Sequence, residues 1–321
     1  MREIRVCELF AGIGGFRKAL ETASSRFQTV YANEFNRYAA AIYRKHWNDG
    51  SLQEETICSV KADDLPDFDL LVGGFPCQPF SVAGRRFGIN DPNGTLFWEI
   101  LRVVKAKQPA MLLFENVPGL LSIDQGAVFA AMLQGLGELG YVCEWQIFNS
   151  RHFGVPQSRR RLFVVCHHRD RAFQAIFPIP TGYKSTKKSN GEKQVCAMLT
   201  SRYYKQGNSD NYVIQIKRTH AQGDDVVRVY QAGVPTLTAQ MGTGGGNVPL
   251  ILQQGSIRRL TPIECERLQG FSDGWTKTGL TSDNRCISIS DTQRYKCLGN
   301  AVTVNVVAAI GKLIVSLWEV S

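Results

Sequence analysis

The sequence lacks the features of exported, membrane and zinc-binding proteins. No apolar run approaches the ~18 residues that would span a bilayer, and no apolar signal core follows the opening Met1-Arg2-Glu3-Ile4-Arg5. No Cys-x-x-Cys pair or paired cysteine spacing suggests zinc, so no metal is expected. The 321 residues are 44% hydrophobic and 20% charged, which is typical of a globular protein with one large core and a smaller second lobe. We therefore expect a cytoplasmic location and no membrane partner.

The nine cysteines are odd in number and scattered, at positions 7, 58, 77, 143, 166, 196, 265, 286 and 297. In a cytoplasmic protein such a set is typical of reduced thiols, of which at most one is reactive.

The net charge of +9 is concentrated in one segment. Residues 181–260 hold 11 Lys and Arg against 4 Asp and Glu, a balance of +7, whereas the remaining 26 basic and 24 acidic residues give +2. A basic excess spread over a whole lobe is what phosphate neutralisation needs. It favours a nucleic-acid partner over the alternative of an ordinary solvated face.

The chain opens with a nucleotide-binding pattern. A strand over residues 4–10 is expected to turn at Gly12-Ile13-Gly14-Gly15 into a helix, and a second strand ends on Glu34. Arg17 stands where a dinucleotide fingerprint would carry its third glycine. This pattern favours a cofactor with a single ribose, whose two hydroxyls would donate hydrogen bonds to Glu34.

Strand and helix patterns then alternate, which predicts an α/β fold with a mostly parallel sheet, helices on both faces, and ligands at the carboxyl ends of the strands. The expected strands are 70–73, 110–115, 141–148 and 161–166, and the expected helices are 96–104, 128–139 and 301–319. After residue 180 the texture changes to short β-like runs, until a capping box at Thr261-Pro262-Ile263-Glu264 starts another helix. We expect one domain of residues 1–180 plus 294–321, and a second, smaller, mostly β or irregular domain of residues 181–293.

One cysteine is placed at the mouth of a strand. The buried-strand pattern of residues 69–72 ends at Gly73-Gly74, and Pro76 and Pro79 stiffen the backbone around Cys77. An arbitrary cysteine is most often a buried core residue, but this loop offers few apolar neighbours. It therefore favours a presented, reactive thiol at the ligand edge of the sheet, where Glu115 also follows a strand.

Six segments resemble motifs of the cytosine-C5 DNA methyltransferases. They follow one another along the chain in the same order as in that family. They are Phe10 to Gly15, Gly74 to Gln78, Phe114 to Val117, Gln157 to Arg161, Arg258 to Phe271, and Leu298 to Val302. The resemblance covers the whole chain. It implies a Rossmann-like S-adenosylmethionine-dependent methyltransferase sheet, with residues 181–293 as the target-recognition domain and hinge.

The chemistry of that family explains the residue types. Carbon 5 of cytosine is a poor nucleophile, so the resemblance assigns Cys77 to add at C6, after which the ring takes the methyl group and S-adenosylhomocysteine is released. It assigns Glu115 to protonate N3. Arg161 would contact the cytosine O2 with Arg159 nearby, and their positive charge would lower the pKa of the Cys77 thiol. Strand alternation places Arg160 on the opposite, solvated face.

The resemblance also implies the cofactor contacts. They are Phe10, Ala11, Gly12, Ile13, Gly14, Glu34, Phe35, Ile57, Pro76, Leu96, Asn300 and Ala301. One position departs from the family, because Thr56 stands where an aspartate usually meets the adenine amino group. Two consequences are open: the cofactor affinity is weakened, or Asp63 or Asp64 substitutes.

Double-stranded DNA is the expected partner, with the target cytosine flipped out of the helix. The implied DNA contacts are Gln78, Ser81, Arg85, Arg86, Arg228 and Thr236. Arg85 and Arg86 would act as phosphate clamps on a loop that closes over the flipped base. We expect a monomer of the bacterial type, either solitary or paired with a cognate endonuclease in a restriction-modification system.

Three alternatives remain. A tRNA methyltransferase of the same family is disfavoured by Pro76-Cys77-Gln78 and by the basic lobe. A nicotinamide-dependent oxidoreductase is disfavoured by the missing third glycine. A catalytically silent DNA-binding regulator would have no use for a presented thiol.

Overall fold

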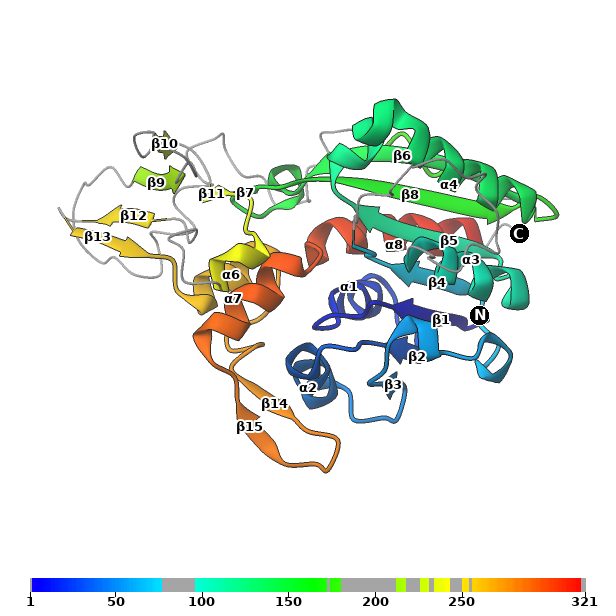
Figure 1. Ribbon diagram of the computed structural model, residues 1–321, viewed down its shortest axis with the longest axis horizontal. Helices are drawn as coiled ribbons and strands as arrows, with labels where there is room; N and C mark the ends of the chain where they lie inside the picture. The colour runs from blue at the N-terminus through cyan, green and yellow to red at the C-terminus, as the bar shows by residue number, and fades with distance from the viewer. Residues whose placement is uncertain are drawn as a thin grey trace.

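The computed structural model describes residues 2–76, 96–171, 174–179, 212–217, 226–230, 234–242, 250–253 and 256–318. Its centre is a seven-stranded sheet in the order β3-β2-β1-β4-β5-β8-β6 (Figure 1). The strands are β1 (Ile4–Leu9), β2 (Phe27–Asn33), β3 (Leu52–Gln53), β4 (Leu70–Gly73), β5 (Met111–Asn116), β6 (Tyr141–Asn149) and β8 (Arg160–His168). All neighbours pair in parallel except β8, which runs antiparallel to β5 and β6. The predicted α/β fold with a mostly parallel sheet is confirmed.

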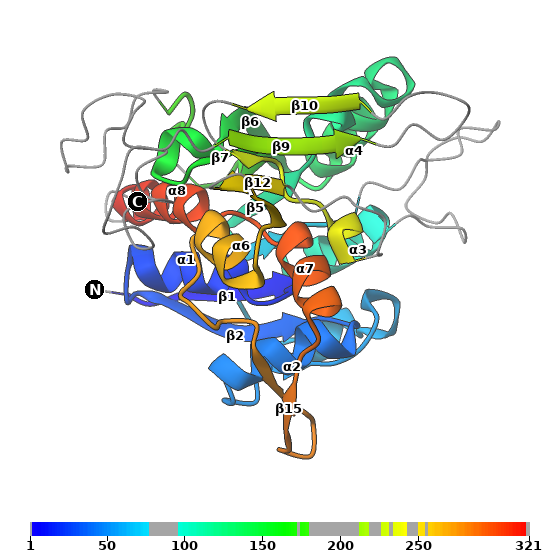
Figure 2. The same ribbon diagram turned by 90° about the vertical axis from the view of Figure 1, so that its left-hand side faces the viewer.

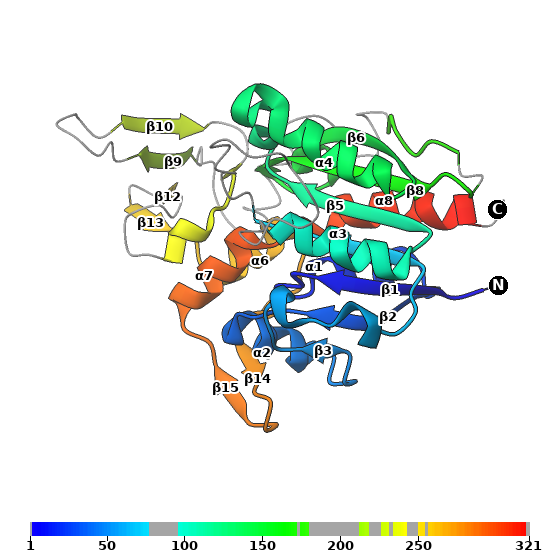
Figure 3. The ribbon, with the colours of Figure 1, turned by 45° about the vertical axis from the view of Figure 1, so that its right-hand side comes forward.

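Helices cover both faces of this sheet, as Figures 1 and 3 show. The helices on one face are α1 (Gly15–Ala23), α2 (Arg37–His46) and α8 (Val304–Trp318), and those on the other are α3 (Leu96–Lys107) and α4 (Ala127–Glu138). Successive strand residues point to opposite faces, so Leu70 and Val72 join the first core and Leu71 joins the second. Because both faces are buried, β4 is apolar throughout and β5 is apolar up to Glu115.

A smaller antiparallel sheet forms the second lobe, with the order β10-β9-β12-β13. Its strands are β9 (Tyr212–Lys217), β10 (Val226–Tyr230), β12 (Leu250–Gln253) and β13 (Ser256–Arg259). Helices α6 (Pro262–Gln269) and α7 (Asp291–Asn300) lie between this sheet and the main one (Figures 1 and 2). The short β runs expected after residue 180 are confirmed for these four segments.

The predicted capping box is present at the start of α6. The Thr261 hydroxyl accepts from the Glu264 N–H at 3.3 Å, and the Glu264 carboxylate accepts from the Thr261 N–H at 2.7 Å. The last helix begins at Val304 rather than at residue 301, because α7 ends at Asn300 and Ala301 is extended.

Part of the segment 260–293 lies in the core beside the main sheet. Leu260, Leu268 and Trp275 belong to the same buried core as the α1 and α8 residues. The hairpin of β14 (Thr278–Leu280) and β15 (Cys286–Ser288) rests on α2, where an Arg44 guanidinium N–H donates to the Leu280 carbonyl at 2.9 Å. A span of α7 and α8, Asp291–Trp318, is apolar enough to cross a membrane by composition, but half of its apolar window is buried in the protein core.

Cys143 and Cys166 form a disulfide, which the sequence analysis did not expect. They lie directly opposite one another on β6 and β8, with their Cα atoms 4.0 Å apart. The two cysteines are 23 residues apart in the sequence, and this spacing does not predict the disulfide. The register between β6 and β8 brings them together.

Candidate active site

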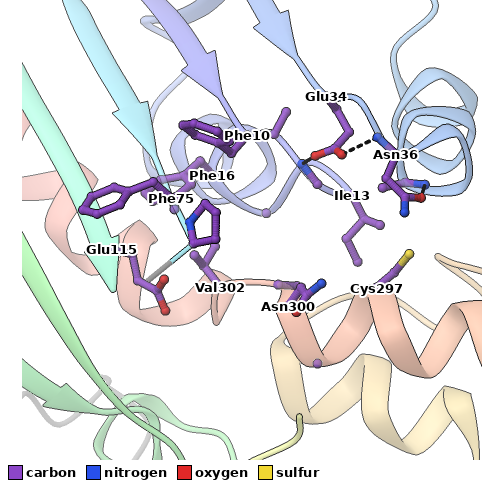
Figure 4. A pocket seen from close by; sticks show the side chains of 18 of the residues that line it. Phe10, Ile13, Phe16, Glu34, Asn36, Phe75, Glu115, Cys297, Asn300 and Val302 are labelled. Atoms are coloured by element: carbon purple, nitrogen blue, oxygen red, sulfur yellow. Dashed lines mark hydrogen bonds between the residues drawn. The ribbon is translucent and has the colours of Figure 1, made fainter. Parts of the chain in front are cut away.

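A cavity of about 570 Å³ opens at the carboxyl ends of β1, β2, β4 and β5. It is lined from both ends of the chain, because α7 closes the side opposite the strands (Figure 4). Eleven of the twelve expected cofactor residues line it, namely Phe10, Ala11, Gly12, Ile13, Glu34, Phe35, Ile57, Pro76, Leu96, Asn300 and Ala301. Glu115, Arg159 and Arg161 line the same cavity.

The twelfth residue, Gly14, has a structural role. It precedes α1 with a left-handed φ of 80°, and a Cβ there would lie 2.2 Å from the Trp47 ring. Only glycine fits this close approach in this conformation. Gly14 is not among the residues that line the cavity, so it shapes the turn rather than the wall.

Glu34 is held by backbone donors at the end of β2. Its Oε2 accepts from the Gly12 N–H at 2.8 Å and its Oε1 from the Asn36 N–H at 2.7 Å. Burial nevertheless raises the pKa of this carboxyl group, against the lowering effect of the N–H donors. Each oxygen keeps acceptor capacity, and Figure 4 shows Glu34 beside the cavity near Ile13. A ribose diol is a ligand that fits these acceptors.

An apolar slot adjoins Glu34. Phe35 is 69% exposed, whereas Ile57 is buried, and both line the cavity together with Leu96. An exposed aromatic ring beside an aliphatic wall suits the faces of a purine. Thr56 lines the cavity next to Ile57. The two proposed substitutes for the missing aspartate, Asp63 and Asp64, are exposed and do not line it, so the structure contradicts that alternative.

Glu115 ends β5 as a buried carboxyl group aimed at the cavity (Figure 4). The Arg161 Nε lies 2.9 Å from its Oε1 as an ion pair. This ion pair holds the two side chains together at the cavity wall. Burial raises the pKa of Glu115 and outweighs the lowering effect of Arg161 and Arg159. The raised pKa shifts the carboxyl group toward its protonated form, which can donate.

Three backbone carbonyls accept hydrogen bonds from the Arg159 side chain. Its guanidinium donates to Leu237 O at 2.7 Å, Gly299 O at 3.1 Å and Ala301 O at 2.9 Å, and only its Nε has no partner. Burial and the neighbouring Arg161 lower the pKa of Arg159 to about 9. Its side chain therefore joins three segments, a role that sequence spacing does not reveal.

Arg161 and Arg160 face opposite ways, as strand alternation predicts. Arg160 is exposed, and Arg161 is half-buried against Glu115. Burial lowers the pKa of Arg161, and the Glu115 carboxylate opposes that shift. Arg161 is the basic side chain that reaches the buried acid.

Several expected residues lie outside the described part of the chain. They are Cys77, Gln78, Ser81, Arg85 and Arg86. Arg228 is on β10, of which only the backbone is described. The Thr236 hydroxyl donates to the Ser158 carbonyl at 2.9 Å. The preceding Pro76 lines the cavity, so Cys77 follows directly in the chain from the cavity wall.

The structure adds cavity residues that the sequence analysis missed. Asn116 donates from its Nδ2 to the Phe75 carbonyl at 3.0 Å and so ties the end of β5 to the segment that leads to Cys77. Lys296 and Cys297 line the opposite wall on α7. Both lie about one helical turn before Asn300, so a helix through Asn300 could have predicted them from the sequence.

The cavity thus combines two kinds of binding site. One end offers ribose acceptors and an apolar slot, and the other offers a buried acid paired with an arginine. Such a site can hold a nucleoside-bearing cofactor while a proton is given to a second planar ligand.

Comparison with known proteins agrees with this geometry. The sequence model of the family described as C-5 cytosine-specific DNA methylase matches residues 4–316. The chain is 35% identical to the Type II methyltransferase M.Bsp6I of Bacillus sp. (strain RFL6), over 96% of this chain and 98% of that protein. It is 32% identical to the Type II methyltransferase M.HhaI of Haemophilus parahaemolyticus, over 96% and 93% of the two chains.

Solved structures share the fold. The S. pombe Dnmt2 methyltransferase superposes with a TM-score of 0.70 at 20% identity, over 98% of this chain and 99% of that chain. A putative DNA modification methyltransferase from an E. coli prophage superposes with a TM-score of 0.66 at 18% identity, over 99% and 100%.

Proposed function

The chain belongs to the C-5 cytosine-specific DNA methylases and is a sequence-specific DNA cytosine-5 methyltransferase, and from that premise we propose how its residues act. The observation that carries the assignment of roles is the pairing of buried Glu115 with Arg161 in the cavity that also contains Glu34. The end of the cavity at Glu34 would bind the cofactor, and the end at Glu115 would hold the reacting base.

We assign the cofactor end to S-adenosylmethionine. Glu34 would accept from the ribose hydroxyls, and Phe35 with Ile57 would hold the two faces of the adenine. When bound, this cofactor supplies an electrophilic methyl group on a sulfonium and leaves as S-adenosylhomocysteine. The neutral Thr56 at this end supports weaker recognition of the adenine edge than a carboxylate would provide.

We assign the other end to a cytosine flipped from double-stranded DNA. The Cys77 thiolate adds to C6 while Glu115 gives its proton to N3, which makes C5 nucleophilic. Once C5 carries the methyl group, its proton goes to a base, the Cys77–C6 bond breaks, and the N3 proton returns to Glu115. Arg161 would hold O2 and stabilise the charge that develops on the ring.

We propose that DNA lies between the two lobes. The basic segment 181–260 would contact phosphates and read the target sequence, with Arg228 and Thr236 as candidates. Gln78, Ser81, Arg85 and Arg86, in the segment after Cys77, are the other proposed DNA contacts. The core packing of residues 260–293 supports a narrower recognition domain, with the rest joining the catalytic domain. A cytoplasmic monomer fits a bacterial modification enzyme, and the names of the relatives support a cognate endonuclease in the same system.

Bisulfite sequencing tests this function. A mixed-sequence duplex is incubated with the protein and S-adenosylmethionine, and conversion-resistant cytosines in one short context are expected. Cys77→Ala should abolish protection, whereas Cys286→Ala, which alters an exposed free cysteine on β15, should retain it. Protection that persists with Cys77→Ala would refute the assigned nucleophile. If no cytosine is protected, the substrate is not duplex DNA, and tRNA is tested next.

A further inference from the structure

Four buried side chains at one wall of the cavity are linked by hydrogen bonds, directly or through the backbone of Leu237 and Ala301, and we call them the buried polar network. Its members are Gln157, Arg159, Gln269 and Thr303, each at most 4% exposed. Gln157 and Gln269 join through their amides at 3.3 Å, and the Thr303 hydroxyl donates to Gln269 Oε1 at 2.9 Å. Buried amides that satisfy each other in this way restrict local movement.

One side of the network contacts the segment that lies between lobe strands β10 and β12. The Leu237 N–H donates to Gln157 Oε1 at 3.0 Å, and the Leu237 carbonyl accepts from Arg159 at 2.7 Å. Just before it, β11 (Val234–Pro235) pairs in parallel with β7 (Gln157–Ser158), and Figure 1 shows the two side by side. Gln157 and Arg159 therefore hold the segment that joins two strands of the second lobe.

The other side contacts the wall of the cofactor end. Arg159 donates to the carbonyls of Gly299 and Ala301, and Gln269 Nε2 donates to Leu298 O at 2.8 Å. Gly299 and Ala301 line the cavity. Arg159 thus bonds both segments directly, and Gln157 on the first segment is joined to Gln269 on the second.

The packing between these two segments leaves no room for independent movement. A Cβ on Gly299 would lie 2.1 Å from the Thr238 carbonyl carbon and 2.3 Å from the Ala239 nitrogen. Main chain therefore rests on main chain where α7 meets η5 (Ala239–Gly242). Two backbones in direct contact must shift together or separate.

We propose that Gln157 and Gln269 are positioning residues that couple DNA binding by the second lobe to cofactor binding in the cavity. The inference rests on the proposed function, because it requires both ligands to bind. Bound DNA restrains the segment of Leu237, which Gln157 and Arg159 bond. Arg159 and Gln269 carry this restraint to the carbonyls of residues 298–301. By linkage, each ligand must raise the affinity for the other by the same factor.

A role in folding alone gives a different expectation. If the network only stabilised the core, its loss would weaken both ligands or lower the melting temperature without changing the ratio of affinities. The coupling factor, which is the dissociation constant of S-adenosylhomocysteine without DNA divided by that with DNA, isolates the proposed role.

The experiment measures this factor by titration calorimetry. The probes are S-adenosylhomocysteine, which cannot donate a methyl group, and a duplex that carries the target found by bisulfite sequencing. The wild type is expected to show a coupling factor of about 10 or more. Gln157→Met keeps the side-chain volume and removes both the amide oxygen and the amide nitrogen. It should bring the coupling factor below about 2. The affinity for S-adenosylhomocysteine without DNA should change less than about threefold.

Gln146→Met is the matched control. Gln146 also bonds backbone at both ends of its amide, to the Ile179 carbonyl at 3.0 Å and the Ile179 N–H at 2.8 Å, but it lies on β6 away from the cavity. It should keep the wild-type factor. Thr303→Val removes a single bond of the network and should give an intermediate factor, which answers the question if Gln157→Met does not fold.

The outcomes separate the two proposals. A wild type that binds neither ligand refutes the proposed function itself. A wild type that binds both with a factor near 1, or a factor that Gln157→Met and Thr303→Val leave unchanged, overturns the coupling role while the methyltransferase assignment stands.

Discussion

The Arg161 guanidinium reaches across from β8 to the buried Glu115 carboxyl group on β5, with Nε 2.9 Å from Oε1. The arginine lowers the pKa of Glu115, while burial raises it by more. The two effects leave an acid with a raised pKa beside a positive charge. A proton donor to a ring nitrogen needs this balance.

Arg161→Gln should move the pH dependence of methyl transfer. Removal of the positive charge raises the pKa of Glu115 further, so the proton needed for N3 is retained to higher pH. The alkaline limb of the single-turnover rate should therefore shift upward while the maximal rate falls about 10-fold or more. The exposed Arg160→Gln serves as the control and should keep both the limb and the rate. An unshifted limb with Arg161→Gln would show that Glu115 does not govern it.

Glu34→Gln should weaken cofactor binding rather than the chemical step. The amide keeps one acceptor oxygen, so Gly12 and Asn36 compete with the ribose for it. The dissociation constant of S-adenosylhomocysteine should rise about 10- to 100-fold, as measured by calorimetry. Glu54→Gln alters a carboxylate that pairs with Arg44 and does not line the cavity, and it should bind as the wild type does. Equal affinities for all three proteins would exclude Glu34 from the site.

Gly299→Ala should destabilise the fold through backbone overlap. The added methyl group would lie 2.1 Å from the Thr238 carbonyl carbon, so α7 and η5 must separate. We expect the free energy of unfolding in urea to fall by about 1–3 kcal/mol. Gly137→Ala in α4 has open space around its Cβ and should instead be neutral or gain about 0.5–1 kcal/mol. Similar values for the two variants would contradict the close approach.

Glu8→Gln should become more stable relative to the wild type as the pH rises. Burial raises the pKa of Glu8 to about 8, against the lowering effect of Arg17 and Tyr43. A raised carboxyl pKa means that the stability present below pH 4.5 is lost between 4.5 and about 8. The difference in unfolding free energy should grow by at most about 1.4 kcal/mol per pH unit across that window and then level off. Urea titrations at pH 5, 6 and 7 check the slope, and a flat difference would show that Glu8 is ionised in the fold.

Much of the site could be predicted because its signals are local. The strand, glycine turn and helix around Gly12, and the acid at the end of the next strand, are short-range patterns that hold wherever the segment is placed. Parallel strands bring their carboxyl ends to one edge. Glu34 and Glu115 therefore had to meet at the same edge of the sheet, and they do.

The sequence by itself determined the α/β class, the order of the functional segments and the chemical types at the cavity, since each depends on spacing within a few residues. Only the tertiary structure decided which polar atoms are already engaged. Arg159 bonds three backbone carbonyls, Asp63 and Asp64 lie outside the cavity that Thr56 lines, and Cys143 forms a disulfide with Cys166. These contacts depend on the register and packing of segments that are distant in the chain. The neighbours in those segments determine how strongly each buried group is desolvated, and no local sequence pattern specifies them.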